Sequence, residues 1–278
     1  MTALLLFLLL APEPVKVATG FRFTEGPAAD KEGNVFFSDI PNERIHRLGV
    51  DGKVTVFREK SGRANGLMFN ATGELVACEG GTGRVVAIAP DGKKVRVLAE
   101  NYGGKRFNAP NDLVIDKQGG IYFTDPEFGR NIKKPQGTFA VYYIAAPGKV
   151  TRVIESLPRP NGIMLSPDQK TLYVAPSRSA KMMAYPVTAP GKLGKGRVFY
   201  ELKQPEGRKD TGGDGMTVDA NGNLYFTSWL GVQVVSPEGK HLRTIKFPEK
   251  PANVTLVGGR KLYVTARTSV YTFLLAGS

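Results

Sequence analysis

Hydrophobic positions along the chain occur in short runs that are separated by turn residues. Val, Ile, Leu, Tyr and Phe make up these runs, Gly, Pro, Asp and Asn separate them, and long stretches with helical periodicity are missing. Between Ala109 and Gly129, for example, two apolar runs flank a turn at Gly119-Gly120, which is the pattern of a β-hairpin. Short runs of these residue types favour strands over helices. The chain is therefore predicted to be all-β.

One hairpin pattern recurs six times along the chain. Its second strands read NVFFSD at Asn34, ELVACE at Glu74, GIYFTD at Gly120, TLYVAP at Thr171, NLYFTS at Asn223 and KLYVTA at Lys261. The strands before them begin at Glu25, Asn65, Asn111, Asn161, Asp214 and Asn253. These starts are 40, 46, 50, 53 and 39 residues apart, so each unit has room for four short strands. Six such units predict a six-bladed β-propeller with four-stranded blades.

The repeats occupy the chain from about Val15 to Leu275, which predicts one propeller domain over residues 15–278. The last unit is short after its second strand. Its third strand is expected at Ser269–Leu275, and Val15–Phe23 is expected to add the outermost strand and close the ring. Closure is needed because a blade buries its two faces only against neighbouring blades.

Residues 1–14 are expected to form a separate segment. Their apolar run, Ala3 to Ala11, is too short to span a membrane as a helix but has the length of a signal-peptide core. If the segment is an export signal, the protein is periplasmic or secreted. If it is an apolar segment packed on the fold, the protein is cytoplasmic.

The six residues that begin the first strands are predicted to form a ring around one mouth of the central channel, since the first strand of a propeller blade is the innermost. All six carry carboxylate or amide oxygen, and they are Glu25, Asn65, Asn111, Asn161, Asp214 and Asn253. Asn and Asp could instead cap the turns that enter the inner strands. Glu is a poor cap, however, and two carboxylates in one small space need a cation to neutralise them. Hard oxygen donors favour Ca²⁺ most, then Mg²⁺ or Mn²⁺, with Zn²⁺ as an opportunistic occupant.

Composition and charge narrow the function further. The formal net charge is +13, and the Lys and Arg residues are spread along the chain. This distribution is typical of a solvated basic surface, matches no nucleic-acid-binding module, and suits an anionic substrate or cell surface. The single cysteine, Cys78, excludes an internal disulfide and a cysteine zinc site. The only histidines, His46 and His241, lie in predicted strands, so a Ser-His-Asp triad is hard to build.

Four motifs at blade spacing resemble the gluconolactonase and senescence marker protein (regucalcin)-like family of calcium-dependent six-bladed propeller hydrolases. The family also includes bacterial drug-responsive lactonases and, more distantly, diisopropyl-fluorophosphatase. The motifs are TEGP (Thr24–Pro27), PNDLVID (Pro110–Asp116), RPNGI (Arg159–Ile163) and GGDGMTVD (Gly212–Asp219). YFTDPEFG (Tyr122–Gly129) is similar to the bacterial lactonase branch. The resemblance extends over nearly the whole chain.

The resemblance implies that Glu25, Asn161 and Asp214 bind the catalytic metal directly. It also implies that Asn111 lies beside the metal, faces the substrate and can coordinate as well. By the repeat alignment, Asn65 and Asn253 lie in the same ring and are expected to support the ligands. In the animal relatives an Arg two residues before the Asn contacts substrate. Ala109 occupies that position here, and the nearest Arg is Arg106.

The implied reaction is hydrolysis of a lactone, a sugar lactone or a related cyclic ester, in which the metal polarises the carbonyl and water attacks. Either Asp214 or a hydroxide on the metal would act as the base. Two alternatives stay open: a phosphotriesterase or phosphofluoridate-type hydrolase on the same site, and a non-catalytic binding platform with a structural metal. The expected partner is a small-molecule substrate, without nucleic acid or a membrane span, bound by a monomer or weak homodimer. Substrate contacts are expected from the mouth loops, at Asn111, Arg106, Asp125, Glu127 and Trp229.

Overall fold

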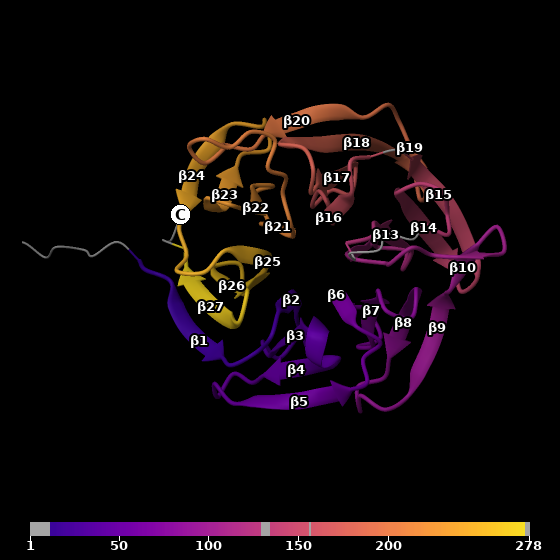
Figure 1. Ribbon diagram of the computed structural model, residues 1–278, viewed down its shortest axis with the longest axis horizontal. Coiled ribbons are helices and arrows are strands. Elements are labelled where there is room, and N and C mark those ends of the chain that lie inside the picture. Colours follow the sequence, from indigo (N-terminus) through magenta and orange to yellow (C-terminus); the bar gives the residue numbers. More distant parts are fainter. Residues whose placement is uncertain (1–11, 129–133, 156, 276–278) are drawn as a thin grey trace, which may run out of the picture.

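A computed structural model gives the structure of residues 12–128, 134–155 and 157–275. Within those residues, six sheets of four or five strands stand around a central axis, and a two-stranded ribbon lies beside them (Figure 1). The predicted six-bladed β-propeller is thereby confirmed. The apolar run of the expected export signal, residues 3–11, lies outside the described residues, as do residues 129–133 of a mouth loop. In the part of the chain that is described, no helix is long and apolar enough to cross a membrane.

The strands of each blade follow one another outward from the axis. Blade 1 contains β2 (Thr24–Ala29), β3 (Val35–Asp39), β4 (Arg44–Leu48) and β5 (Val54–Glu59). Blade 2 contains β6 (Ala64–Phe69), β7 (Leu75–Glu79), β8 (Arg84–Ile88) and β9 (Val95–Ala99). Blade 3 contains β12 (Leu113–Ile115), β13 (Ile121–Asp125), β14 (Ala140–Ala146) and β15 (Lys149–Glu155).

The second half of the chain repeats this order with one addition. Blade 4 contains β16 (Pro160–Leu165), β17 (Thr171–Pro176), β18 (Lys181–Ala189) and β20 (Arg197–Glu201), and the short β19 (Lys192–Leu193) also pairs with β18. Blade 5 contains β21 (Met216–Val218), β22 (Leu224–Ser228), β23 (Gly231–Val235) and β24 (His241–Ile245). Blade 6 contains β25 (Pro251–Val257), β26 (Lys261–Ala266), β27 (Ser269–Leu274) and β1 (Val15–Thr19). The ribbon consists of β10 (Asn101–Tyr102) and β11 (Lys105–Arg106).

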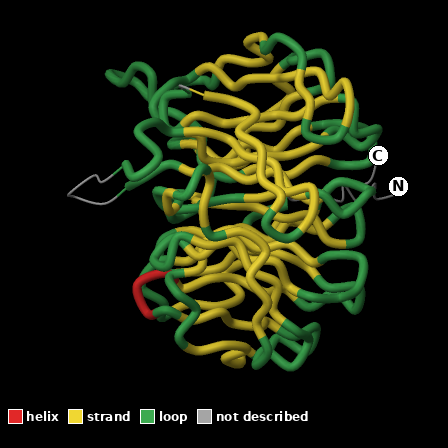
Figure 2. The backbone as a smooth tube through the Cα atoms, turned by 90° about the vertical axis from the view of Figure 1, so that its right-hand side faces the viewer, coloured by secondary structure: helices red, strands yellow, loops and turns green. Residues whose placement is uncertain are grey.

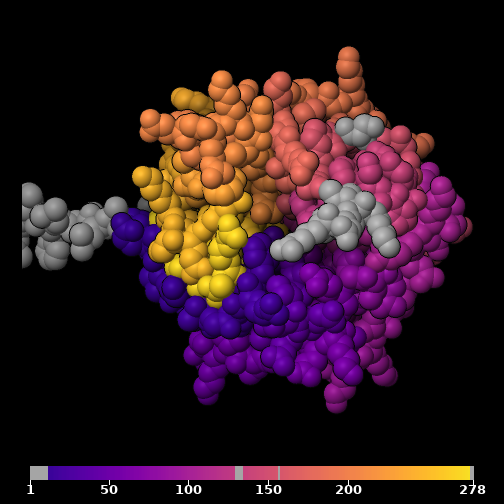
Figure 3. Space-filling view, viewed as in Figure 1, coloured from indigo at the N-terminus to yellow at the C-terminus, as the bar shows by residue number. Residues whose placement is uncertain are grey.

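The two ends of the propeller close on each other, as the sequence predicts. Strand β1 pairs antiparallel with β27, with Val15 opposite Thr272 and Thr19 opposite Ser269. Figure 3 shows the first blade in indigo directly beside the last blade in yellow. The last blade is therefore built from both ends of the chain, and the ring of blades has no open edge between its first and last members.

The core lies between neighbouring blades. Phe123 and Tyr142 of blade 3 pack in one cluster with Val76 of blade 2, and Tyr122 of blade 3 packs with Leu172 of blade 4 on the other side. Second strands such as β3, β7, β13 and β22 are buried along their whole length, whereas the outermost strands β5 and β15 are mostly exposed or half-buried. This explains why second strands read as continuous apolar runs: both of their faces are covered.

The loops gather on the two faces of the disc. Figure 2 shows the disc from the side, and the 3₁₀ helix η1 (Ile40–Asn42) marks the face at which second strands end and first strands begin. We call this face the mouth face. All loops that connect a first strand to a second strand lie on the opposite face.

Candidate active site at the channel mouth

The inner strands of adjacent blades approach one another closely at the mouth face. A Cβ atom added at Gly66 would overlap the side chain of Asp112 in the next blade, and one added at Gly215 would overlap the amide of Asn253. Backbone hydrogen bonds cross the same gaps, from Gly66 N–H to Asn111 O at 2.7 Å and from Gly215 N–H to Ala252 O at 2.8 Å. Glycine at positions 66 and 215 is therefore required for neighbouring inner strands to approach this closely.

Hydroxyl groups at the ends of second strands hold this ring in place. Ser38 donates to Asn65 O, Thr124 donates to Asn161 O and Thr227 donates to Ala252 O, each at 2.8 Å. Every one of these bonds runs from one blade to the inner strand of the next. These bonds are buried or partly buried, so they fix the position of the ring backbone.

Three predicted metal ligands meet inside the ring. Asn161 donates from Nδ2 to Asp214 Oδ1 at 2.6 Å, and Glu25 Oε2 accepts the N–H of Gly26 at 2.9 Å. The charge of Asp214 repels that of Glu25. Glu25 and Asn161 are 4% and 6% exposed, so water screens this repulsion weakly. Glu25 thus bonds to the backbone of the next residue, whereas Asn161 bonds to Asp214 of the neighbouring blade.

The carboxyl groups of this site are costly to ionise without a cation. Burial, with the charge of Asp214 as the next cause, raises the pKa of Glu25 well above its usual range. Burial also raises the pKa of Asp214 to about 6, although the charge of Lys250 and the hydrogen bond from Asn161 oppose the increase. A cation bound between these two carboxyls would stabilise their ionised forms and so lower both pKa values.

Asp112 is a further buried carboxyl that the sequence interpretation missed. Its Oδ1 accepts the N–H of Leu113 at 2.9 Å, and Asn253 Nδ2 lies 3.4 Å from its Oδ2. Burial raises the pKa of Asp112 to about 7 despite these two contacts. A signal was available in the repeats, because the residue after the ring position is glycine in four blades and aspartate in this one.

The donor set fits a hard divalent cation. Among the described residues, no three His, Cys, Asp or Glu side chains come close enough to form a metal site from those types alone. The candidate site instead combines the carboxylates of Glu25 and Asp214 with the amide of Asn161, so every donor is an oxygen. Carboxylate and amide oxygens without sulfur or imidazole are the ligands that Ca²⁺, Mg²⁺ and Mn²⁺ prefer.

Asn111 lies at the rim of the same site. Its backbone is held on both sides, since its N–H donates to Thr124 O at 2.9 Å and its carbonyl accepts from Gly66. Its side-chain amide has no hydrogen bond to another described residue. A hollow of about 460 Å³ opens beside it, lined among others by Asn65, Arg106 and Glu127. This arrangement suits a side chain that meets a small substrate.

The remaining predicted substrate contacts differ in how the structure places them. The Arg106 guanidinium lines the hollow but donates to the carbonyls of Phe107, Asn108 and Gly81, each at 2.8 Å. Trp229 lies in the turn between β22 and β23, and its side chain is 40% exposed.

Asp125 requires a correction. The side chain is fully buried, and its two oxygens accept the N–H groups of Asn108 and Ala109 at 2.9 and 2.8 Å. Burial raises the pKa of Asp125 to about 7, although these two hydrogen bonds lower it. Its carboxyl is thus occupied in holding the loop that precedes Asn111, and the expected substrate contact is replaced by this structural role.

The raised pKa values predict a pH-dependent stability in the metal-free protein. An acid whose pKa is higher folded than unfolded stabilises the fold while it is protonated and loses that contribution as pH rises. The usual pKa of an Asp carboxyl is 3.8, so the free energy of unfolding begins to fall near that pH. The contribution of Asp214 is lost by about pH 6 and that of Asp112 by about pH 7, each at up to ~1.4 kcal/mol per pH unit. Urea unfolding in a chelator is expected to give a free energy of unfolding that falls between these limits. The fall should be shallower in Asp112→Asn, and equal slopes in both proteins would contradict the assignment.

Comparisons with known proteins agree with this architecture. The model of the SMP-30/gluconolactonase/LRE-like region matches residues 23–268. The chain is 30% identical to the gluconolactonase of Zymomonas mobilis subsp. mobilis over 284 aligned residues, which cover 92% of this chain and 80% of that protein. A gluconolactonase structure from Xanthomonas campestris superposes with a TM-score of 0.85 at 30% identity, covering 95% of this chain and 90% of the other. Regucalcin from Agrobacterium tumefaciens, a calcium-binding protein, shares the fold with a TM-score of 0.78 at 22% identity, covering 95% and 93% of the two chains.

Proposed function

This chain belongs to the SMP-30/gluconolactonase/LRE-like family, and from that premise we propose that it is a lactonase whose reaction takes place at the mouth of the propeller channel. The observation that carries the proposal is the pair of carboxyls of buried Glu25 and half-buried Asp214, which repel each other beside the amide of Asn161. The gluconolactonases among the relatives support hydrolysis of a lactone as the reaction class. A binding platform would have no use for this arrangement, because unneutralised buried carboxylates destabilise a fold.

Glu25, Asn161 and Asp214 would hold a divalent cation in this proposal. The cation would supply polarisation of the lactone carbonyl and stabilise the negative charge that develops on its oxygen. Calcium is the ion that the oxygen donors favour first. The likeness to the calcium-binding regucalcin of Agrobacterium tumefaciens carries the fold alone, so the choice of ion rests on the chemistry of the donors.

Other residues of the site would accept the proton, orient the substrate and position the ligands. Asp214 would accept a proton from the attacking water, a role that a carboxylate beside a metal can take. Lys250 favours the ionised form of Asp214 that this role requires. Asn111, whose amide has no other described partner, is positioned to orient the lactone by hydrogen bonding. Thr124 supports both sides of the site, because it donates to Asn161 O and accepts the N–H of Asp112 at 3.1 Å.

Metal removal tests the proposal directly. The purified protein is expected to hydrolyse D-glucono-1,5-lactone, to lose that activity in a chelator, and to regain it when Ca²⁺, Mg²⁺ or Mn²⁺ is restored in excess. The ion that restores activity at the lowest concentration identifies the preferred occupant. Activity that persists after complete removal of metal would contradict the role of a cation. Hydrolysis of a phosphotriester without hydrolysis of any lactone would favour the other reaction class.

A further inference from the structure

Two cations lie over the ring of the only tryptophan of the chain on the mouth face, and a third, Arg267, is close enough to repel one of them. Trp229 lies in the turn between β22 and β23, Arg208 lies in the segment before β21, and Lys250 directly precedes β25. Arg267 lies in the turn between β26 and β27. These four residues, which we call the cationic rim, come from blades 5 and 6, the blades that also contribute Asp214 and Asn253 to the ring.

The geometry of the rim is compact. The Nζ atom of Lys250 lies 4.3 Å from the centroid of the Trp229 ring, and Cζ of Arg208 lies 4.0 Å from it. Both cations are attracted to the indole face. Burial lowers the pKa of Lys250, and repulsion by Arg267 and then by Arg208 lowers it further, although the charges of Asp214 and Glu25 oppose the decrease. Two like charges on one indole ring are stabilised by an anion that lies between or beside them.

No carboxylate of the chain fills that role among the described residues. Ion pairs within 4.0 Å involve neither Lys250 nor Arg208 nor Arg267 there. Arg208 and Arg267 are exposed and Lys250 is half-buried. Within the described part of the chain, the three positive charges therefore reach the mouth without an ion-pair partner.

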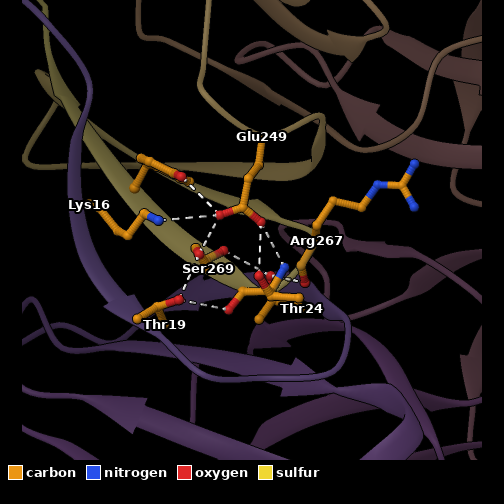
Figure 4. A network of polar contacts seen from close by, with 8 residues as sticks. Lys16, Thr19, Thr24, Glu249, Arg267 and Ser269 are labelled. Carbon is orange, nitrogen blue, oxygen red and sulfur yellow. Dashed lines mark hydrogen bonds and ion pairs between the residues drawn. The ribbon is translucent and has the colours of Figure 1, made fainter.

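The adjacent carboxylate of Glu249 is engaged elsewhere. It accepts hydrogen bonds from Thr268 and Tyr271 at 3.0 and 2.9 Å, lies 3.6 Å from Lys16, and is also bonded to Ser269 (Figure 4). Partial burial raises its pKa, but these hydrogen bonds lower it to about 2. Figure 4 also shows the Arg267 side chain pointing away from this network. Glu249 thus stabilises the closure of blade 6 and leaves the rim positive.

The rim is close enough to the reacting groups to act on the same small molecule. The charge of Lys250 attracts both Asp214 and Glu25, although neither lies within ion-pair distance. Because Lys250 is half-buried, its field is screened less than that of a surface lysine. A ligand that reaches from the ring to Lys250 would place its lactone carbonyl at the proposed metal site. Its other end would then lie near the positive charge of Lys250.

We propose that the cationic rim binds an anionic substituent of the substrate, so that the preferred substrates are lactones carrying a carboxylate or a phosphate. This inference rests on the proposed lactonase function and specifies its substrate class. Arg208 offers a planar guanidinium that can donate two parallel hydrogen bonds to such an anion, and Lys250 adds a point charge. The net charge of +13 steers anionic substrates toward the protein in the same sense.

Matched pairs of lactones test the inference. D-glucono-1,4-lactone and D-glucaro-1,4-lactone differ only in a hydroxymethyl group or a carboxylate at C6. D-glucono-1,5-lactone and its 6-phosphate form a second pair. The wild type is expected to show a higher kcat/KM for the anionic member of at least one pair, by about tenfold at low ionic strength and less in high salt. The pair that shows the larger preference identifies carboxylate or phosphate.

Variants assign the preference to the rim. Lys250→Met and Arg208→Gln are each expected to lower the ratio of anionic to neutral kcat/KM by about tenfold. Lys261→Met is the matched control, since Lys261 also lies over an aromatic ring, 5.1 Å from the centroid of Tyr263, but begins β26 on the opposite face. It should leave the ratio unchanged. The ratio separates a charge effect on the substrate from a general effect on Asp214, which would lower both rates alike.

The outcomes distinguish the inference from the function on which it rests. If neutral and anionic lactones are hydrolysed equally well, or if both rim variants lower the two rates in parallel, the rim does not select substrates and the lactonase function still stands. If neither member of either pair is hydrolysed at any metal concentration, the proposed function fails and the inference fails with it. A wild-type preference that disappears in Lys250→Met and persists in Lys261→Met supports the inference.

Discussion

Asp214→Asn is expected to lower kcat for lactone hydrolysis by ~10²–10³-fold, with a further loss from weaker metal binding. The substitution is nearly isosteric, so the close packing of Gly215 against Asn253 should survive. It removes a negative charge from the ring and the carboxylate that we propose as proton acceptor. Rates should be measured for the purified variant across a titration of Ca²⁺, together with circular dichroism to verify the fold.

The metal titration separates the two roles of Asp214. Activity that returns at saturating Ca²⁺ would make Asp214 mainly a ligand, whereas a loss that persists would show that it also acts on water or substrate. Asp168→Asn provides the same change of side chain in the exposed β16–β17 turn on the opposite face, and it should retain full activity. Full activity of Asp214→Asn at ordinary Ca²⁺ concentration would exclude both roles.

The architecture could be predicted from the sequence because its signal is repeated. A continuous apolar run such as NVFFSD or NLYFTS follows from burial on both faces of a second strand, and six copies at blade spacing leave few other folds. The closing strand could also be predicted, since the last unit lacked a fourth strand and Val15–Thr19 was the only unassigned strand pattern. Repetition turns several weak local signals into one strong signal.

The strand boundaries near the site were harder to predict. Strands β12 and β21 begin two residues after their ring positions, at Leu113 and Met216. Pro110 precedes the first and Gly212-Gly213 precede the second, and both disfavour a regular ladder. The ring residues of these blades therefore lie on irregular backbone that hydrogen bonds from neighbouring blades hold in place.

The features that escaped prediction depend on contacts between blades. Asp112 stands where four other blades have glycine, but its burial and its approach to Asn253 across the ring depend on contacts that the repeat alignment does not give. Asp125 matches a loop residue in sequence but is turned inward by two backbone N–H groups. The four residues of the cationic rim come from four separate loops, and no repeat alignment can give the distances between them. Metal coordination by the ring stays a prediction, and its sharpest test does not depend on activity.

Glu25→Gln is expected to change metal affinity and metal-free stability in opposite directions. Glutamine keeps the shape of the side chain and can still accept the N–H of Gly26. It removes the negative charge of residue 25, so that Asp214 is the only carboxylate left among the proposed ligands. Altering a residue that only supports a ligand typically costs ~10–100-fold in metal affinity, so removing a ligand's charge should cost about 100-fold or more. In the metal-free protein the same change removes a buried carboxyl that Asp214 repels, so stability near neutral pH should rise.

Calorimetric titration with Ca²⁺ and thermal melts in a chelator measure the two effects on the same samples. Glu32→Gln, in the exposed turn between β2 and β3 on the opposite face, removes the same charge and should alter neither quantity. Because the two expected effects have opposite signs, a variant that is merely misfolded cannot produce them together: misfolding would lower both affinity and melting temperature. Unchanged Ca²⁺ affinity in Glu25→Gln would show that Glu25 is not a ligand. A lower melting temperature in the chelator would show that its carboxyl is stabilised by the fold itself, without need of a cation.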